Sequence, residues 1–261
     1  MRRTLLVLVM TAAVMAGCGG GDSGDKLLQL LAAAPDKSVA KGTSKVAIGV
    51  DVTGSVSTSY TIEGEFDFKQ ERGRFSLDLS KLGFPEGGPS EVRFSGSSAF
   101  MQLQEKEWLK VDLGVLGRSS GINKPTAQLY YLKGVTGEVR KLGTEAVRGE
   151  PTTRYAAPVD LDRTARAVSP KLRDEIRQTI RQLGTSDLAT EAWLDGAGRL
   201  RQLRYTIDLS TLSSTSASPP RGKVAATYEF FDFGVGVEVA DPPAAQVVDL
   251  AAIPSPTAKK K

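Results

Sequence analysis

Two groups of side chains in this sequence have types and spacing that could support chemistry. Ser38 and Lys41 have the S-x-x-K spacing in which a lysine activates a serine hydroxyl for acyl transfer. The companion S-D-N and K-T-G segments are absent from the sequence, and a lysine at the end of a predicted helix is favoured by the helix dipole alone. Glu63, Glu65 and Asp67 share one face of a predicted strand and could bind a cation, but their alternation with an apolar face favours a solvated surface. Neither group predicts a catalytic or metal site.

The residue types that are missing exclude most other catalytic sites. The chain has 261 residues, with no histidine and one cysteine. Ser-His-Asp and Cys-His catalysis, histidine-ligated metals, internal disulfides and thiolate zinc clusters are therefore excluded. Only carboxylate-pair or serine–lysine chemistry remains for an enzyme, and we predict a protein without catalysis and without a cofactor.

The N-terminal segment has the pattern of a secretory signal peptide. Met1-Arg2-Arg3 is basic, and residues 5–16 form an apolar stretch. That stretch is too short to span a bilayer as a helix, which takes about 20 residues. The pattern predicts an exported protein whose signal peptide is residues 1–17.

Cys18 follows this segment and is the expected site of lipidation. The preceding Met15-Ala16-Gly17 resembles a bacterial lipobox, except that leucine is usual where Met15 stands. The alternative is an ordinary signal peptide followed by an incidental buried cysteine. Lipidation predicts an anchor on the extracytoplasmic face of the cell membrane, since two or more acyl chains hold a protein there stably. We expect residues 18–24, which are rich in glycine, to form a flexible tether.

The net charge gives no indication of nucleic acid as a partner. The chain has 34 basic and 30 acidic residues, and two of the basic residues, Arg2 and Arg3, lie in the predicted signal peptide. The mature chain is therefore nearly neutral, whereas nucleic-acid binding needs a strong basic surface.

Alternation of apolar and polar residues predicts β-strands over most of the mature chain. Val46, Ile48 and Val50 share one strand face, and residues 188–209 form the clearest hairpin. About ten or eleven strands joined mostly by tight turns predict an antiparallel sheet with one covered face.

Segments with helical spacing are expected to form helices that cover that face. We expect helices over residues 25–40 and 161–183, the second divided at Ser169-Pro170, and a short helix after Asn123. The predicted fold class is α+β, a strongly curved antiparallel sheet (a half-barrel) with helices on its concave face. We expect one domain over residues 25–240 and a flexible C-terminal tail over residues 241–261.

Three segments carry a resemblance to a known family. They are Trp108 to Val111 after a hairpin turn, Val147 to Tyr155 at a strand entry, and Trp193 to Leu200 in a late hairpin. With the lipobox, the leading helix and the long meander, they make the chain similar to the LppX/LprG-type actinobacterial lipoproteins, whose half-barrel is shared with the wider LolA/LolB and RseB group. The resemblance implies a hydrophobic cavity that holds lipid or glycolipid acyl chains and carries them within the cell envelope, with a transporter or acceptor protein of the envelope as partner. The alternative is a sensor, regulatory or structural lipoprotein of the same fold that binds a protein partner.

Apolar residues expected on the inner surface are the candidates for lining such a cavity, because each acyl methylene that leaves water contributes roughly 0.8 kcal/mol. The alternative for each candidate is that its side chain packs against other side chains in a core without a cavity. The candidates are Ile48, Val50, Ile62, Phe66, Phe75, Leu77, Leu129, Tyr130, Leu172, Ile176 and Ile180.

The helix predicted over residues 161–183 is basic as well as amphipathic. Arg173, Arg177 and Arg181 are candidates for contact with anionic lipid headgroups or the membrane. The alternative is a solvated helix face whose charge is partly balanced by nearby acidic residues.

Overall fold

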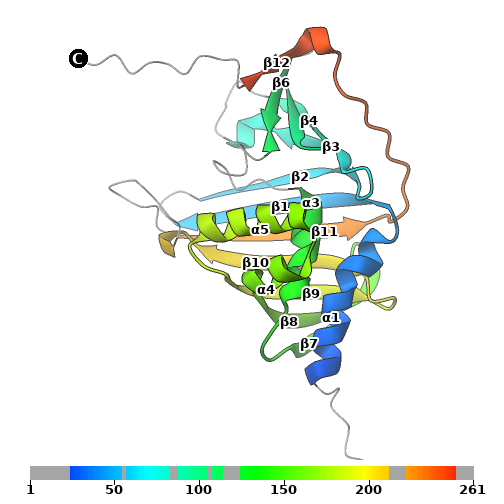
Figure 1. Ribbon diagram of the computed structural model, residues 1–261, viewed down its shortest axis with the longest axis vertical. Helices are drawn as coiled ribbons and strands as arrows, with labels where there is room; N and C mark the ends of the chain where they lie inside the picture. The colour runs from blue at the N-terminus through cyan, green and yellow to red at the C-terminus, as the bar shows by residue number, and fades with distance from the viewer. Residues whose placement is uncertain are drawn as a thin grey trace, which may run out of the picture.

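One sheet runs through the part of the chain that the structure describes (Figure 1). The computed structural model describes residues 24–54, 57–82, 88–104, 107–113, 124–211 and 222–250. The predicted signal peptide, Cys18, the tether up to residue 23 and the tail beyond residue 250 lie outside these residues.

The sheet has twelve strands within the described residues, in the order β12-β6-β5-β4-β3-β2-β1-β11-β10-β9-β8-β7. Neighbouring strands are antiparallel, except that β12 runs parallel to β6. The strands are β1 (Thr43–Gly54), β2 (Thr58–Asp67), β3 (Arg72–Asp78), β4 (Pro89–Ser95), β5 (Ser98–Gln104), β6 (Glu107–Asp112), β7 (Arg140–Val147), β8 (Glu150–Asp160), β9 (Asp187–Asp195), β10 (Leu200–Asp208), β11 (Gly222–Phe231) and β12 (Val247–Asp249).

The sheet is curved and open, and the helices lie on one side of it (Figure 1). This confirms the predicted α+β half-barrel. The hairpin predicted over residues 188–209 is confirmed as β9 and β10. The helices are α1 (Gly24–Val39), α3 (Pro125–Tyr130), α4 (Leu161–Ala167) and α5 (Pro170–Leu183), with short 3-10 turns η1 (Leu79–Leu82), η2 (Tyr131–Gly134), η3 (Leu209–Thr211) and η4 (Ala244–Gln246).

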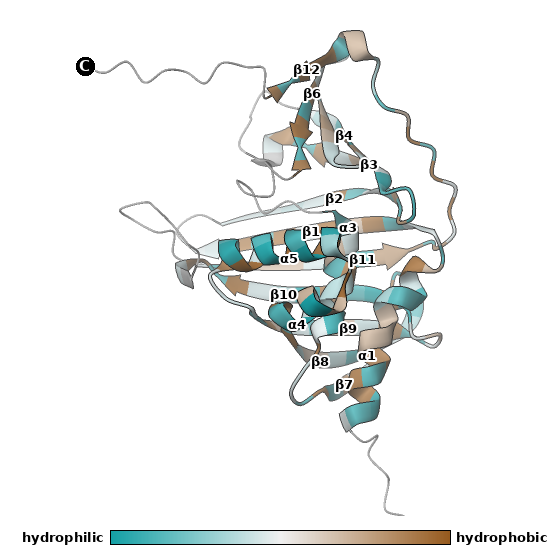
Figure 2. Ribbon diagram, in the orientation of Figure 1, coloured by the Kyte–Doolittle hydropathy of each residue, from teal (hydrophilic) through white to brown (hydrophobic). Residues whose placement is uncertain are grey.

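Capping residues explain where α4 begins and where α5 begins and ends. The Asp160 carboxylate accepts hydrogen bonds from the backbone N–H groups of Asp162 and Arg163, at 2.8 and 3.2 Å, and so caps α4. Pro170 begins α5, and Gly184 ends it in the left-handed conformation with φ 69°. Figure 2 shows hydrophilic residues on the side of α5 that faces away from the sheet. None of the described helices is both long and apolar enough to cross a membrane.

Two glycines allow β2 and β3 to pack closely. A Cβ added to Gly64 would lie 2.1 Å from the Arg74 carbonyl oxygen, and one added to Gly73 would lie 2.4 Å from the Phe66 ring. Glycine at both positions therefore lets the inner-face rings lie across the neighbouring strand. The rings of Phe75 and Phe94 meet edge to face at 5.4 Å, an arrangement that adds about 0.5–1.5 kcal/mol to the burial of the two rings.

The segment after β11 corrects one expected boundary. The Arg72 guanidinium donates a hydrogen bond to the Val239 carbonyl oxygen at 3.1 Å, and the Arg93 guanidinium donates one to the Ala240 carbonyl oxygen at 3.0 Å. Residues 247–249 then form β12 on the edge of β6. The sheet therefore continues past residue 240, where we expected the domain to end, and has one strand more than the upper expected count. A three-residue strand is too short to show the alternation by which strands are recognised.

Ser38 joins α1 to the sheet. Its hydroxyl donates a hydrogen bond to the Ala34 carbonyl oxygen and accepts one from the Leu200 backbone N–H, both at 2.9 Å. The residue is fully buried, whereas Lys41 is exposed. Ser38 thus has a structural role at the start of β10, and its S-x-x-K spacing does not form a serine–lysine pair.

We predict that Ser38→Ala lowers the free energy of unfolding by about 1–3 kcal/mol, because it leaves the buried Leu200 N–H without an acceptor. Urea unfolding followed by circular dichroism measures the change. Ser76→Ala, on the exposed outer face of β3, is the control and should change stability by less than about 0.5 kcal/mol. Equal stability of the two variants would contradict this role of Ser38.

Candidate functional site

The concave face of the sheet is fully buried at one end and partly exposed at the other. In β1, Val46 has no exposed surface, while Ile48 and Val50, on the same face, are partly exposed. Strand register places Ile48 opposite Ile62 of β2 and Tyr228 of β11, both also partly exposed. We call the partly exposed set the open half of the concave face; it comprises Ile48, Val50, Tyr60, Ile62, Ile207 and Tyr228.

Helix α5 lies over one half of β1 (Figure 1) and keeps apolar surface partly exposed before and after its buried centre. Ile176 is fully buried in the core, but Leu172 and Ile180, one turn before and after it, are partly exposed. These three lie four residues apart and so share one helix face. Leu172 borders a charged hollow at the start of α5, and Ile180 keeps partly exposed apolar surface towards the other end of the helix.

The structure divides the sequence-predicted cavity residues into two groups. Ile48, Val50, Ile62, Leu172 and Ile180 keep exposed apolar surface on the concave face or beside α5. The buried group packs in the core instead, and its members are Phe66, Phe75, Leu77, Leu129 and Ile176.

Tyr130 lies apart from the open half. It borders a hollow of about 440 Å³ formed by the end of α1, by α3, by the start of α5 and by the β2–β3 turn. Charged groups dominate this hollow; those of the described residues are Asp36, Glu71, Lys124, Lys133, Lys171 and Glu175. A second hollow, of about 320 Å³, shares Lys124, Lys171 and Glu175 with the first.

Glu71 joins three elements at the hollow of about 440 Å³, which we call the charged entrance. The carboxylate oxygen Oε2 of Glu71 accepts hydrogen bonds from the ammonium groups of Lys124, at the start of α3, and Lys171, at the start of α5, each at 2.6 Å. The Lys124 side chain is only 4% exposed, so its charge depends on this carboxylate. Glu71 thereby ties the β2–β3 turn to both helices.

The two carboxylates near Lys124 have opposite pKa shifts. Burial raises the pKa of Glu71, but the hydrogen bonds from Lys124 and Lys171 outweigh it, so the pKa is lowered overall. Burial raises the pKa of Glu175, and nearby Lys124 and Lys171 offset this only in part. The entrance therefore holds one firmly ionised carboxylate and one that takes up a proton more readily.

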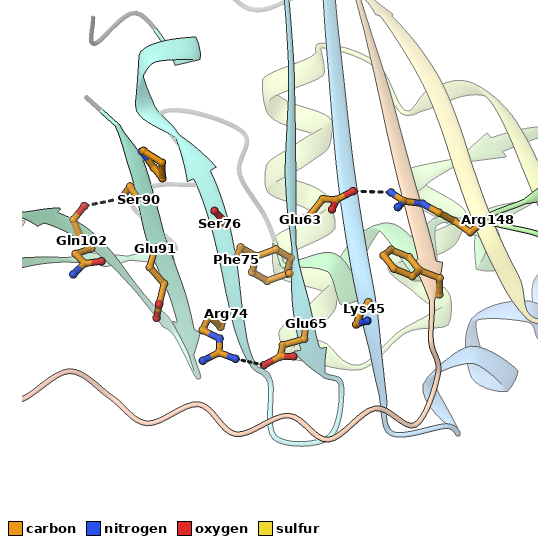
Figure 3. Close-up of a pocket in the computed structure, with 13 residues that line it drawn as sticks. Lys45, Glu63, Glu65, Arg74, Phe75, Ser76, Ser90, Glu91, Gln102 and Arg148 are labelled. Carbon is orange, nitrogen blue, oxygen red and sulfur yellow. Dashed lines mark hydrogen bonds and ion pairs between the residues drawn. The ribbon is translucent and has the colours of Figure 1, made fainter. Parts of the chain in front are cut away.

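A hollow of about 640 Å³ lies on the outer face of the sheet and is lined by charged side chains of both signs (Figure 3). Arg148 forms an ion pair with Glu63 at 2.7 Å, and Arg74 forms one with Glu65 at 2.8 Å. The two strand-face glutamates considered for cation binding are thus each paired with an arginine. Among the described residues, no group of three acidic, histidine or cysteine side chains could hold a metal ion. This charged surface does not suit an acyl chain.

The three candidate arginines of α5 are in different environments. The Arg173 side chain donates a hydrogen bond to the Ala165 carbonyl oxygen at 3.0 Å and so fixes α5 to α4. Arg177 and Arg181 are exposed, and Arg181 borders the hollow of about 320 Å³. Headgroup contact by these residues stays a prediction.

Sequence reasoning missed Glu71 and Lys124. The two residues are 53 positions apart, and Glu71 and Lys171 are 100 positions apart. Each is a charged residue near a turn or a helix start, and no spacing pattern in the sequence indicates that it has a functional partner. Only the fold brings them together.

We predict that Glu71→Gln lowers the free energy of unfolding by about 1–3 kcal/mol at neutral pH, because it removes the carboxylate partner of the buried Lys124. Since the folded-state pKa of Glu71 is below the ordinary value of about 4.3, its contribution is complete above that pH and is lost as the pH falls through the lowered pKa. Thermal unfolding from pH 7 to pH 3 should show the stabilities of wild type and variant converging at the acidic end. Glu138→Gln, at an exposed position, is the control; a pH-independent gap for Glu71→Gln would contradict the assignment.

Comparison with solved structures identifies the fold. The lipoprotein LppX of Mycobacterium tuberculosis is 17% identical over 84% of this chain and 100% of that chain, with a TM-score of 0.51. LprF of Mycobacterium bovis is 14% identical over 84% of this chain and 97% of that chain, with a TM-score of 0.49. No protein-family profile and no curated protein matches the sequence. The chain adopts the LppX fold, as its sequence resemblance to the LppX/LprG-type lipoproteins implied.

Proposed function

We propose that this protein is a lipoprotein, anchored on the extracytoplasmic face of the cell membrane, that binds the acyl chains of a lipid or glycolipid and carries them within the cell envelope. The observation that carries the proposal is the apolar surface left partly exposed on the concave face. The expected signal peptide and lipidation at Cys18 support the location. The LppX fold supports the placement of the ligand between sheet and helices.

The open half provides the binding energy in this proposal. Its residues are apolar apart from two tyrosines, and Ile180 of α5 keeps further apolar surface partly exposed. Each acyl methylene buried there contributes about 0.8 kcal/mol, so a long chain binds without any strong polar contact. A headgroup would remain at the charged entrance beside Lys124 and Lys171, or near the exposed Arg177 and Arg181.

A second candidate function is that of a sensor or regulatory lipoprotein that binds a protein partner. The observation that favours it is the polar hollow on the outer face, which is lined by charges of both signs and by the Phe231 ring. Arg148 stacks over this ring at 4.4 Å. Such a surface fits a polar protein segment better than a lipid.

We predict that the full chain carrying Cys18→Ser binds a fluorescent long-chain acyl probe and retains acyl lipid in native mass spectrometry. Adding Val50→Trp should weaken probe binding at least tenfold, because the indole occupies the open half. Thr61→Trp, exposed on the other face of β2, is the matched control and should leave binding unchanged. Undiminished binding by Val50→Trp would show that the ligand lies elsewhere, and absence of binding by the parent protein would favour the second function.

We predict that the wild-type chain fractionates with membranes and incorporates labelled palmitate, and that Cys18→Ser loses both properties. The reason is that stable anchoring requires acyl chains on Cys18. Ser23→Ala, in the same predicted tether, should behave as wild type does. Retention of Cys18→Ser in the membrane fraction after a high-salt wash would contradict lipid anchoring through this residue.

A further inference from the structure

Five polar side chains, the fifth being the buried Thr179 that hydrogen-bonds with Tyr131, lie together in the otherwise apolar interior. Tyr131 of η2 and Tyr205 of β10 have ring centroids 5.9 Å apart, and Tyr205 stacks on Tyr228 of β11 at 6.0 Å. Gln128 of α3 hydrogen-bonds with this group. The row runs from the helices across the concave face to the open half.

Some hydrogen-bond donors and acceptors in this row lack a close partner. The Tyr205 and Tyr228 hydroxyl oxygens are 3.5 Å apart, longer than the usual O–H···O hydrogen bond of about 2.5–3.0 Å. Among the described residues Tyr228 makes no other hydrogen bond through its side chain, and the buried amide oxygen of Gln128 has no partner. Burial raises the pKa of Tyr131, Tyr205 and Tyr228, so all three hydroxyls remain protonated donors near neutral pH.

Tyr228 is the last residue of this polar row and also belongs to the open half. It lies opposite Ile48 in the strand register and is partly exposed, whereas Tyr205 and Tyr131 are buried. Tyr60, opposite Val50 on β2, is near enough to interact electrostatically with Tyr228. An acyl chain bound along the isoleucines would therefore pass beside the Tyr228 hydroxyl.

The chemistry of that hydroxyl restricts what can lie against it. A pure hydrocarbon would remove water from the Tyr228 O–H and give it no acceptor, which opposes binding. A carboxylate would accept the hydrogen bond but would bring a charge into a region where the neighbouring ionisable groups are tyrosines. A neutral carbonyl oxygen accepts the hydrogen bond without that cost.

We propose that the ligand is an ester-linked acyl lipid whose ester carbonyl oxygen accepts a hydrogen bond from the Tyr228 hydroxyl. The acyl chain lies on Ile48 and Ile62, and Tyr228 selects esters over lipids that lack the carbonyl group. This inference rests on the proposed function, because it assumes that acyl chains occupy the open half.

The test compares two probes that differ only in the carbonyl groups. One is a pyrene-labelled diacylglycerol, and the other is its ether-linked dialkyl counterpart with the same chain lengths. The full chain carrying Cys18→Ser should bind the ester about fivefold more tightly than the ether, the ratio expected for one hydrogen bond. Tyr228→Phe should bind both probes with the affinity that the parent shows for the ether. Thr61→Val, which removes an exposed hydroxyl from the outer face of β2, should keep the fivefold ratio.

The outcomes separate this inference from the proposed function. Equal affinity of the parent protein for the two probes overturns the ester preference but leaves acyl binding intact. A fivefold ratio that survives in Tyr228→Phe overturns the assignment to Tyr228. Binding of neither probe overturns the proposed function, and this inference with it. The ratio of ester to ether affinity is measured first in the Cys18→Ser protein alone, so the ester preference is tested even if Tyr228→Phe does not fold.

Discussion

The concave face of the sheet is longer than α5, and the site depends on the partly exposed apolar residues in the half over which α5 lies. β1 has 12 residues and α5 has 14. A strand rises about 3.3 Å per residue and an α-helix about 1.5 Å, so β1 spans roughly 40 Å and α5 roughly 21 Å. α5 lies along the direction of β1 and β11 (Figure 1). One helix of that length can cover about half of the strand, and α5 lies over the half of β1 that ends at Gly54, where Ile48 and Val50 remain partly exposed (Figure 1).

Two polar contacts attach the N-terminal end of α5. Lys171 reaches Glu71, and Arg173 reaches the Ala165 carbonyl oxygen, both from the first turn of the helix. Lys171 is 59% exposed, and an ion pair with so exposed a partner adds at most about 1 kcal/mol to stability. Burial of Ile176 contributes about 1.5–3 kcal/mol and holds the helix on the sheet. The ion pair therefore orients a helix that the apolar contact holds in place.

Local periodicity predicted the elements, but it did not predict how they cover one another. The alternation around Val46 and the spacing of Leu172, Ile176 and Ile180 marked their inward faces correctly, because those patterns lie within one element. An inward position does not say whether a residue is buried: Phe66 and Ile62 have the same pattern, yet one is covered and the other is partly exposed. That difference depends on the length and placement of helices far away in the sequence. The entrance at Glu71, the polar row ending at Tyr228 and the strand β12 likewise arise from contacts between distant segments.

Side-chain size reinforces the difference between the two halves of the concave face. The buried half is filled by large rings that contact one another, namely Phe66, Phe68, Phe75, Phe94 and Phe230. In the open half, β1 and β2 hold the aliphatic Ile48, Val50 and Ile62 besides Tyr60, and Val50 lies opposite the small Ala226 in the pair with β11. Aliphatic side chains of this size make fewer contacts than aromatic rings would, and fewer contacts lower stability. The loss is consistent with a site for a ligand, since a bound acyl chain restores the same contacts and removes the same surface from water.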